Sequence, residues 1–230
     1  MTRRTDMVDV NAQIDAVDRS VRTIDVDGEP ARVQSLTQRY PSGLDDVWDA
    51  VTSPERIARW FLPVSGDLKL GGRYQLVGNA GGEILECAPP QGHAARYRVT
   101  WEYGGGMSWL EIALTGEDDE STTLELIHTA RVAEVPPGFW ELYGPGATGV
   151  GWDQGLLGLA MHLRGGERIA PEDAEAWMVG AEGRAFSRAA ADGWAAAQVA
   201  DGGDPAAAAS AAHATYLFYT GQSGDEAPEA

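Results

Sequence analysis

The chain has 230 residues, a length that suits one domain with appendages. Its 17 lysines and arginines stand against 35 aspartates and glutamates, and the net charge of −18 repels phosphate backbones and anionic lipid surfaces. Nucleic acid and membrane partners are therefore not expected, and a single cysteine, Cys87, excludes an intramolecular disulfide and any multi-cysteine metal site.

The first thirty residues are expected to form an N-terminal helical arm (1–30). Residues 8–23 place four apolar side chains at spacings of three or four, which predicts a short amphipathic helix: Val10, Ile14, Val17 and Val21. The segment DGEP then interrupts the pattern, and residues 31–40 alternate as a first strand does. No apolar stretch follows the basic residues at the start, so a secretory signal is not expected and a reducing cytoplasm is the expected location.

Two short helices are predicted next. Ser42, with an aspartate three residues later, has the pattern of a capping box, and Ser53 followed by Pro54 has the pattern of a second helix start. The second helix ends in the aromatic pair Trp60 and Phe61. Large aromatic side chains around so short a corner either fill an ordinary core or close one end of a hollow space.

The middle of the chain, from residue 67 to residue 129, is typical of an antiparallel β-meander. Its strands alternate, and each sends one set of side chains to a common face, which includes Tyr97, Val99 and Trp101, then Leu110, Ile112 and Leu114, then Leu124, Leu126 and His128. A sheet with one apolar face needs a cover. The helical pattern of residues 146–165 supplies one.

Three glycines mark this covering helix. Gly151, Gly155 and Gly158 lie at i, i+4 and i+7, so they form a smooth stripe along one side. A glycine inside a helix costs about 1 kcal/mol relative to alanine. We therefore expect something to approach this stripe closely, either the sheet backbone or a ligand.

An alanine-rich helical extension is expected over residues 166–222, and a disordered tail over residues 223–230. Asp204 and Pro205 have the pattern of a helix start within the extension. Its aromatic side chains are more than a solvated helix needs, so they either pack on the main domain or bury a dimer face: Trp177, Trp194, Tyr216, Phe218 and Tyr219.

The order of these elements resembles the helix-grip arrangement of START-like (SRPBCC) proteins. Several segments, including YPSGLDDVWDAVTSPERIARWF, GGRYQLVG, GGEILECAPP, VTWEY and LELIHT, resemble the bacterial homologues of the activator of the heat-shock-protein-90 ATPase, and the resemblance runs from Val33 to Gly165. It implies an α+β fold over residues 31–165, a curved antiparallel sheet with two short helices and a long helix packed across it, followed by additional C-terminal helices.

The resemblance also implies a place for function. Many START-like proteins bind an apolar ligand between the sheet and the long helix, and a minority, such as the aromatase/cyclases of polyketide assembly, carry out chemistry there. We accordingly expect a small apolar or aromatic ligand, without cofactor or metal, to contact the inward-facing residues of this region: Trp60, Phe61, Tyr74, Leu76, Tyr97, Val99, Trp101, Leu110, Leu126, His128, Gly155, Leu156 and Leu159.

Catalysis has little support in the sequence. His128 shares the face of Leu124 and Leu126, where a neutral histidine could act as a general base with Asp153 or Glu102 as its partner, although a histidine on an apolar face is more often a structural residue. Three hypotheses stay open at this point. They are a ligand-binding module, a chaperone-linked or regulatory interaction protein without a ligand, whose C-terminal helices could form a homodimer, and a cyclase- or hydrolase-like enzyme.

Overall fold

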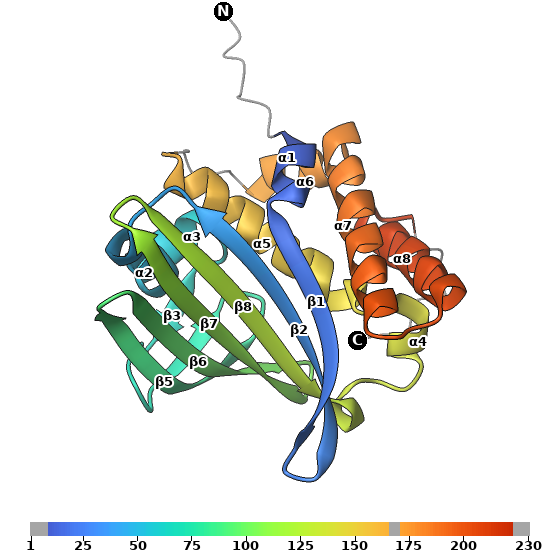
Figure 1. Ribbon diagram of the computed structural model, residues 1–230, viewed down its shortest axis with the longest axis horizontal. Coiled ribbons are helices and arrows are strands. Elements are labelled where there is room, and N and C mark those ends of the chain that lie inside the picture. Colours follow the sequence, from blue (N-terminus) through green and yellow to red (C-terminus); the bar gives the residue numbers. More distant parts are fainter. Residues whose placement is uncertain (1–8, 166–170, 223–230) are drawn as a thin grey trace, which may run out of the picture.

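A computed structural model describes residues 9–165 and 171–222 (Figure 1). Its strands are β1 (Val17–Val26), β2 (Glu29–Tyr40), β3 (Val64–Gly66), β4 (Arg73–Leu76), β5 (Gly81–Gln91), β6 (Ala94–Tyr103), β7 (Gly106–Asp118) and β8 (Ser121–Arg131). Its α-helices are α1 (Val10–Asp15), α2 (Leu44–Thr52), α3 (Pro54–Trp60), α4 (Phe139–Tyr143), α5 (Gly146–Leu163), α6 (Pro171–Val179), α7 (Ala181–Ala200) and α8 (Pro205–Tyr219), and a 3-10 turn, η1, covers Val132–Glu134.

The strands form one antiparallel sheet in the order β1-β2-β8-β7-β6-β5-β4-β3. The long helix α5 crosses behind this sheet in Figure 1, and α2 and α3 stand at one end of the same space. Alternate residues of β7 and β8 point toward α5 and are buried, among them Leu110, Ile112, Leu124 and Leu126. This is the expected helix-grip fold, so the predicted fold class is confirmed.

The N-terminal helix is shorter than predicted. Helix α1 ends at Asp15, and Val17 and Val21 belong to strand β1 instead, where both are buried. The interruption predicted at DGEP is the turn of the β1–β2 hairpin, in which Asp27 and Gly28 both have positive φ angles of 57° and 85°. The prediction of a helix over residues 8–23 is wrong beyond Asp15, because pairing with β2 decides the conformation there.

The two helix starts before the corner differ from each other. Gly43, not Ser42, is the N-cap of α2, and the Ser42 hydroxyl donates to the Asp46 carboxylate, so the predicted capping box is wrong. Ser53 is the N-cap of α3 with Pro54 at its first turn, as predicted. Asp204 likewise begins α8, and its carboxylate accepts a hydrogen bond from the Ala207 amide at 2.8 Å.

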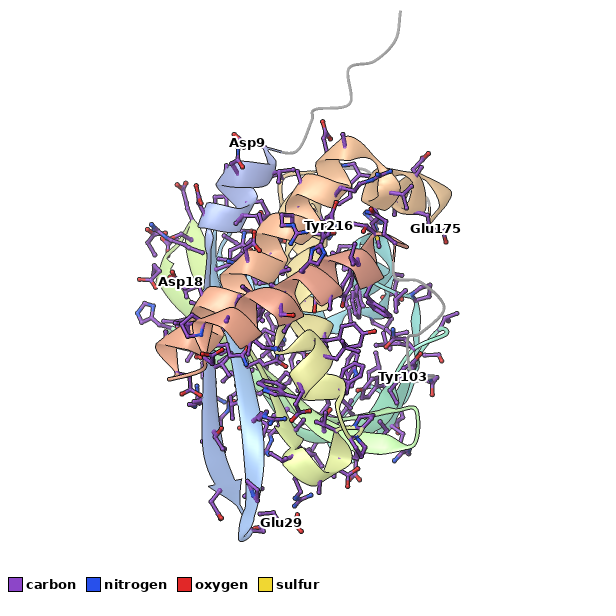
Figure 2. The ribbon with its side chains drawn as sticks, turned by 90° about the vertical axis from the view of Figure 1, so that its right-hand side faces the viewer. Asp9, Asp18, Glu29, Tyr103, Glu175 and Tyr216 are labelled. Atoms are coloured by element: carbon purple, nitrogen blue, oxygen red, sulfur yellow. The ribbon has the colours of Figure 1, made fainter. Side chains whose placement is uncertain are left out.

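The C-terminal helices pack on the main domain. Figure 2 shows α7 and α8 crossing in front of α5, with the β1–β2 hairpin projecting beyond them to Glu29. Phe186 and Trp194 of α7 are buried in the same core cluster as the sheet residues Leu36 and Leu126. The aromatic side chains of the extension that were singled out in the sequence therefore mostly meet this chain's own core, although Phe218 remains 49% exposed. The predicted disordered tail lies outside the described residues.

A buried ion pair joins three segments that are far apart in the sequence. Arg19 of β1 donates from Nη2 to Asp153 Oδ1 of α5 at 2.6 Å, and their side chains are only 7% and 1% exposed. The Trp194 indole of α7 donates to Asp153 Oδ2 at 2.9 Å. A Cβ atom on Gly193 would lie 3.3 Å from Arg19, and one on Gly149 would overlap the Trp194 indole. These glycines make room for the two side chains.

We expect Gly149→Ala and Gly155→Ala, both within α5, to change stability in opposite directions. Alanine at position 149 overlaps the indole of Trp194, and overpacking of this kind costs about 1–3 kcal/mol. At position 155 the nearest atom to a new Cβ belongs to Phe61 at 3.8 Å, so the helix gains up to about 1 kcal/mol from alanine. Urea unfolding of both variants measures this difference, and equal effects would contradict the packing described for Gly149.

Candidate functional site

A cavity of about 150 Å³ lies between the sheet and α5, and the α2–α3 corner closes one end of it. Side chains from α2, α3, α5 and strands β3 to β8 line it. Its wall consists of Val51, Thr52, Ile57, Trp60, Phe61, Val64, Leu68, Tyr74, Leu76, Ile84, Cys87, Tyr97, Val99, Trp101, Leu110, Ile112, Leu124, Leu126, Trp152, Gly155, Leu156 and Leu159.

The residues that the sequence predicted for a ligand contact lie together around this cavity, with one exception. The exception is His128, which is buried beside the wall but does not line it. All the other predicted residues are in the wall: Trp60, Phe61, Tyr74, Leu76, Tyr97, Val99, Trp101, Leu110, Leu126, Gly155, Leu156 and Leu159. Their contact with a ligand stays a prediction.

Some wall residues were missed in the sequence although a signal existed. Ile112 and Leu124 alternate with the predicted Leu110 and Leu126, and Trp152 lies four residues before Leu156 on the same helix face. Val64 and Leu68 have no such signal, because they lie at the end of the corner and in the turn after the short strand β3.

The corner that closes the cavity is held to its neighbours by specific contacts. The Trp60 indole donates to the Ala50 carbonyl of α2 at 2.9 Å. Arg56 donates to Asp46 of α2 at 2.6 Å and to His162 of α5 at 3.1 Å. A Cβ atom on Gly158 of α5 would overlap the Trp60 carbonyl oxygen, so this glycine lets the corner touch the long helix.

The predicted glycine stripe therefore meets several different partners. Gly158 meets the backbone of α3, while a Cβ on Gly151 would lie 3.1 Å from the Tyr219 hydroxyl of α8. Only Gly155 lines the cavity. The close approach predicted for this stripe is made mainly by neighbouring helices.

Strand β5 contributes an exposed residue to the cavity wall. Cys87 is exposed and lines the cavity, and it pairs across the sheet with Tyr97. A register shift between Ile84 and Glu86 adds one residue to β5 just before this point. Cys87 is therefore not a buried thiol.

His128 belongs to a hydrogen-bonded chain behind the cavity wall. Its Nε2 lies 2.9 Å from Ser108 Oγ, and its Nδ1 lies 3.4 Å from Gln34 Oε1. Gln34 in turn donates to the Pro145 carbonyl and accepts from the Thr148 hydroxyl. Burial lowers the pKa of His128 from 6.5 to about 4, so its ring is neutral near pH 7. Both ring nitrogens face protein groups, and the ring centroid lies 5.5 Å from that of Trp152, a residue of the cavity wall.

Asp153 and Glu102, the two suggested partners of His128, are engaged elsewhere. Asp153 accepts hydrogen bonds from Arg19 and Trp194, and Glu102 accepts from Arg73 at 2.6 Å. Burial raises the pKa of Asp153, and the hydrogen bonds from Arg19 and Trp194 act in the opposite direction. Neither carboxylate hydrogen-bonds to His128, so the geometry does not assemble an acid–base pair.

Two features are absent from the part of the chain that the structure describes. Within residues 9–165 and 171–222, no group of three or more histidine, cysteine, aspartate or glutamate side chains could hold a metal ion. In the same part of the chain, no helix is both long enough and apolar enough to cross a membrane.

Comparison with known proteins identifies relatives of this fold. A family model described as "Activator of Hsp90 ATPase homolog 1-like protein" matches residues 43–163. The crystal structure of CalU16 from Micromonospora echinospora is 34% identical with a TM-score of 0.60, over 79% of this chain and 98% of that chain. Its solution NMR structure is 32% identical with a TM-score of 0.64, over 81% and 97% of the two chains.

A more distant structure supports the fold alone. EF2215 from Enterococcus faecalis, a conserved protein of unknown function, is 12% identical with a TM-score of 0.50, over 73% of this chain and 94% of that chain. The chain has no match in the comparison with curated proteins. The likeness to CalU16 covers more of the chain than the family model does.

We expect the neutral His128 to make stability depend on pH. Its pKa is about 4 in the folded chain and 6.5 when exposed, so its contribution is complete above pH 6.5 and is lost as the pH falls toward 4. The loss amounts to about 3 kcal/mol. The measurement is urea unfolding between pH 7 and pH 4 for His128→Gln, which lacks this loss, with the exposed His93→Gln as control. Parallel stability curves for the wild type and His128→Gln would refute the assignment.

We expect Arg19→Met to destabilise the fold by about 3–5 kcal/mol, because it leaves the buried Asp153 carboxylate without its cation. Adding Asp153→Leu to this variant should recover much of the loss, since the uncompensated charge is then gone. Arg22→Met, at an exposed position of the same strand, is the matched control and should change stability by less than about 0.5 kcal/mol. Thermal and urea unfolding measure all three, and a small effect of Arg19→Met alone would contradict the role given to the ion pair.

Proposed function

The chain belongs to the family of activator of Hsp90 ATPase homolog 1-like proteins, and we propose that it is a START-like binding protein for one small apolar or aromatic molecule. The cavity between the sheet and α5 is the proposed binding site. The single observation that carries the proposal is that this cavity is lined almost wholly by apolar and aromatic side chains.

The size of the cavity limits the ligand. A dry apolar cavity of about 150 Å³ holds a molecule of the size of benzene. Drug-sized ligands occupy pockets of roughly 300–1,000 Å³. The volume of about 150 Å³ therefore favours a ligand with one or two rings, or a ligand whose remainder projects past the exposed Cys87.

The aromatic side chains of the wall favour a flat ligand. Trp101 and Trp152 meet edge to face with their ring centroids 4.9 Å apart, and Trp60 lies 5.6 Å from Phe61. A planar ring inserted among them finds the same edge and face contacts that these residues make with one another.

The two alternative functions have less support. An enzymatic function has less support because the two candidate catalytic residues, His128 and Asp153, each form hydrogen bonds to other protein groups. For an interaction protein, the buried Trp194 and Phe186 pack within this chain and leave fewer aromatic side chains for a partner. A homodimer through the C-terminal helices and a cytoplasmic location stay predictions.

Native mass spectrometry of freshly purified protein is the first test. We expect a small molecule that travels with the folded chain and is released on unfolding, because an apolar cavity of this size retains a fitting ligand. Soaking the stripped protein with benzene, indole or naphthalene and observing saturation transfer to the ligand by NMR supplies the second arm. If no molecule is retained and none of the probes binds, the proposal is overturned.

We expect Gly155→Leu to abolish this binding by filling the cavity, at little cost in stability, because a Cβ fits at that position. The matched control is Gln154→Leu, which puts the same side chain one residue away, outside the cavity wall, and should bind as the wild type does. Gly158→Leu is unsuitable because it would collide with the Trp60 backbone. Equal binding by Gly155→Leu and the wild type would place the ligand elsewhere.

A further inference from the structure

The hydrogen-bonding groups around the cavity fall into two sets. Three of them already donate to backbone carbonyls: Thr52 to Trp48 at 2.7 Å, Trp60 to Ala50 at 2.9 Å and Tyr74 to Thr100 at 2.7 Å. The indole N–H of Trp152, in contrast, is buried and has no acceptor among residues 9–165 and 171–222. The Tyr97 hydroxyl and the Trp101 indole N–H belong to two further side chains of the wall, and neither forms a hydrogen bond within this part of the chain.

Trp152 is the clearest member of the second set. The residue is 8% exposed, its Nε1 is buried, and no described group accepts its hydrogen. An indole N–H can only donate. A buried donor without an acceptor is unfavourable, so Trp152 gains a hydrogen bond if its ring turns to bring the N–H to an acceptor on a bound molecule.

The Tyr97 hydroxyl can also donate a hydrogen bond to a ligand. Burial raises the pKa of Tyr97 well above its usual value, so the phenol keeps its proton at every physiological pH. Its ring is fixed edge-on against Trp48 at a centroid distance of 6.2 Å. The three groups of the wall that are left to bond with a ligand, from Tyr97, Trp101 and Trp152, are therefore hydroxyl and N–H groups that can donate.

The wall contains no ionisable side chain that is charged near neutral pH. Among residues 9–165 and 171–222, no lysine, arginine, histidine, aspartate or glutamate lines it, and the chain as a whole has a net charge of −18. A carboxylate ligand would be buried without a cation.

We propose, on the basis of the binding function proposed above, that the cavity selects uncharged aromatic molecules bearing a hydrogen-bond acceptor such as an aryl ketone or ether oxygen. The acceptor oxygen binds to a donor among Tyr97, Trp101 and Trp152. Hydrocarbons of the same shape bind more weakly, and aryl carboxylates are rejected.

Three probes of one shape test this selection at pH 7: acetophenone, α-methylstyrene, in which a CH₂ group replaces the carbonyl oxygen, and benzoate. We expect acetophenone to bind about three- to tenfold more tightly than α-methylstyrene, the range of one net hydrogen bond. Benzoate should bind about a hundredfold more weakly than acetophenone, because its charge has no partner. Ligand-observed NMR titration gives all three dissociation constants.

The donor is then identified from the ratio of the dissociation constants of acetophenone and α-methylstyrene. Because the two probes have the same shape, changes of packing in a variant cancel in this ratio. We expect the preference for acetophenone to disappear in at least one of Tyr97→Phe, Trp101→Phe and Trp152→Phe. Tyr74→Phe is the matched control, because the Tyr74 hydroxyl already donates to Thr100 and its removal should leave the ratio unchanged.

The outcomes separate the two proposals. The binding function stands if both uncharged probes bind and Gly155→Leu abolishes their binding. The selection for an acceptor is nevertheless wrong if the two probes bind with equal affinity, or if benzoate binds as tightly as acetophenone. A preference that survives all three donor variants also overturns the selection. If neither uncharged probe binds, the selection is wrong, and the binding function falls with it only if no molecule is retained and benzene, indole and naphthalene also fail to bind. If Gly155→Leu binds the probes like the wild type, both proposals fall.

Discussion

The position of α5 depends on one buried ion pair, and the rest of the structure follows from that position. Asp153 lies in the middle of α5, and Arg19 and Trp194 bind it from β1 and α7. Removing two charges from water is costly, and only close geometry with further hydrogen bonds compensates for it. Here Arg19 contacts both carboxylate oxygens, and its Nη1 donates to the Val17 carbonyl at 2.9 Å. The first strand, the long helix and the C-terminal extension are therefore one cooperative unit.

The same helix is held on a second side, which explains why an apolar space can remain open beneath it. Gly149 meets the Trp194 indole, and Gly158 meets the carbonyl of Trp60. These two contacts, one with α7 and one with α3, help to set the distance between α5 and the sheet. They do not involve the sheet side chains that lie beneath the helix. Packing in protein interiors normally leaves few voids larger than a water molecule. A cavity of about 150 Å³ persists here because its roof is held in part from outside the wall, by the contact of Gly149 with Trp194.

Most of the cavity wall was predictable because alternation along β6, β7 and β8 is enough to assign the inward face. The helix grip was assigned from the resemblance of the segments and their order to START-like proteins. The N-terminal error has a simple cause, since Val17 and Val21 are four residues apart, and that spacing gives one face in a helix and also one face in a strand. The surroundings of His128 were not predictable, because Gln34 and Ser108 come from strands whose register only the folded sheet defines.

The packing of α7 along β1 has a consequence for how copies of this chain meet. A strand at the edge of a sheet presents unpaired backbone groups that can template polymerisation. At one edge, α7 lies against the first half of β1, and the remainder carries the exposed Arg22 and Asp25. At the other edge, β3 has only three residues. Within the described residues, neither edge of the sheet is a long, flat, apolar strand. The C-terminal extension, which holds α5 through Trp194, therefore also hinders the pairing of edge strands between copies of this chain.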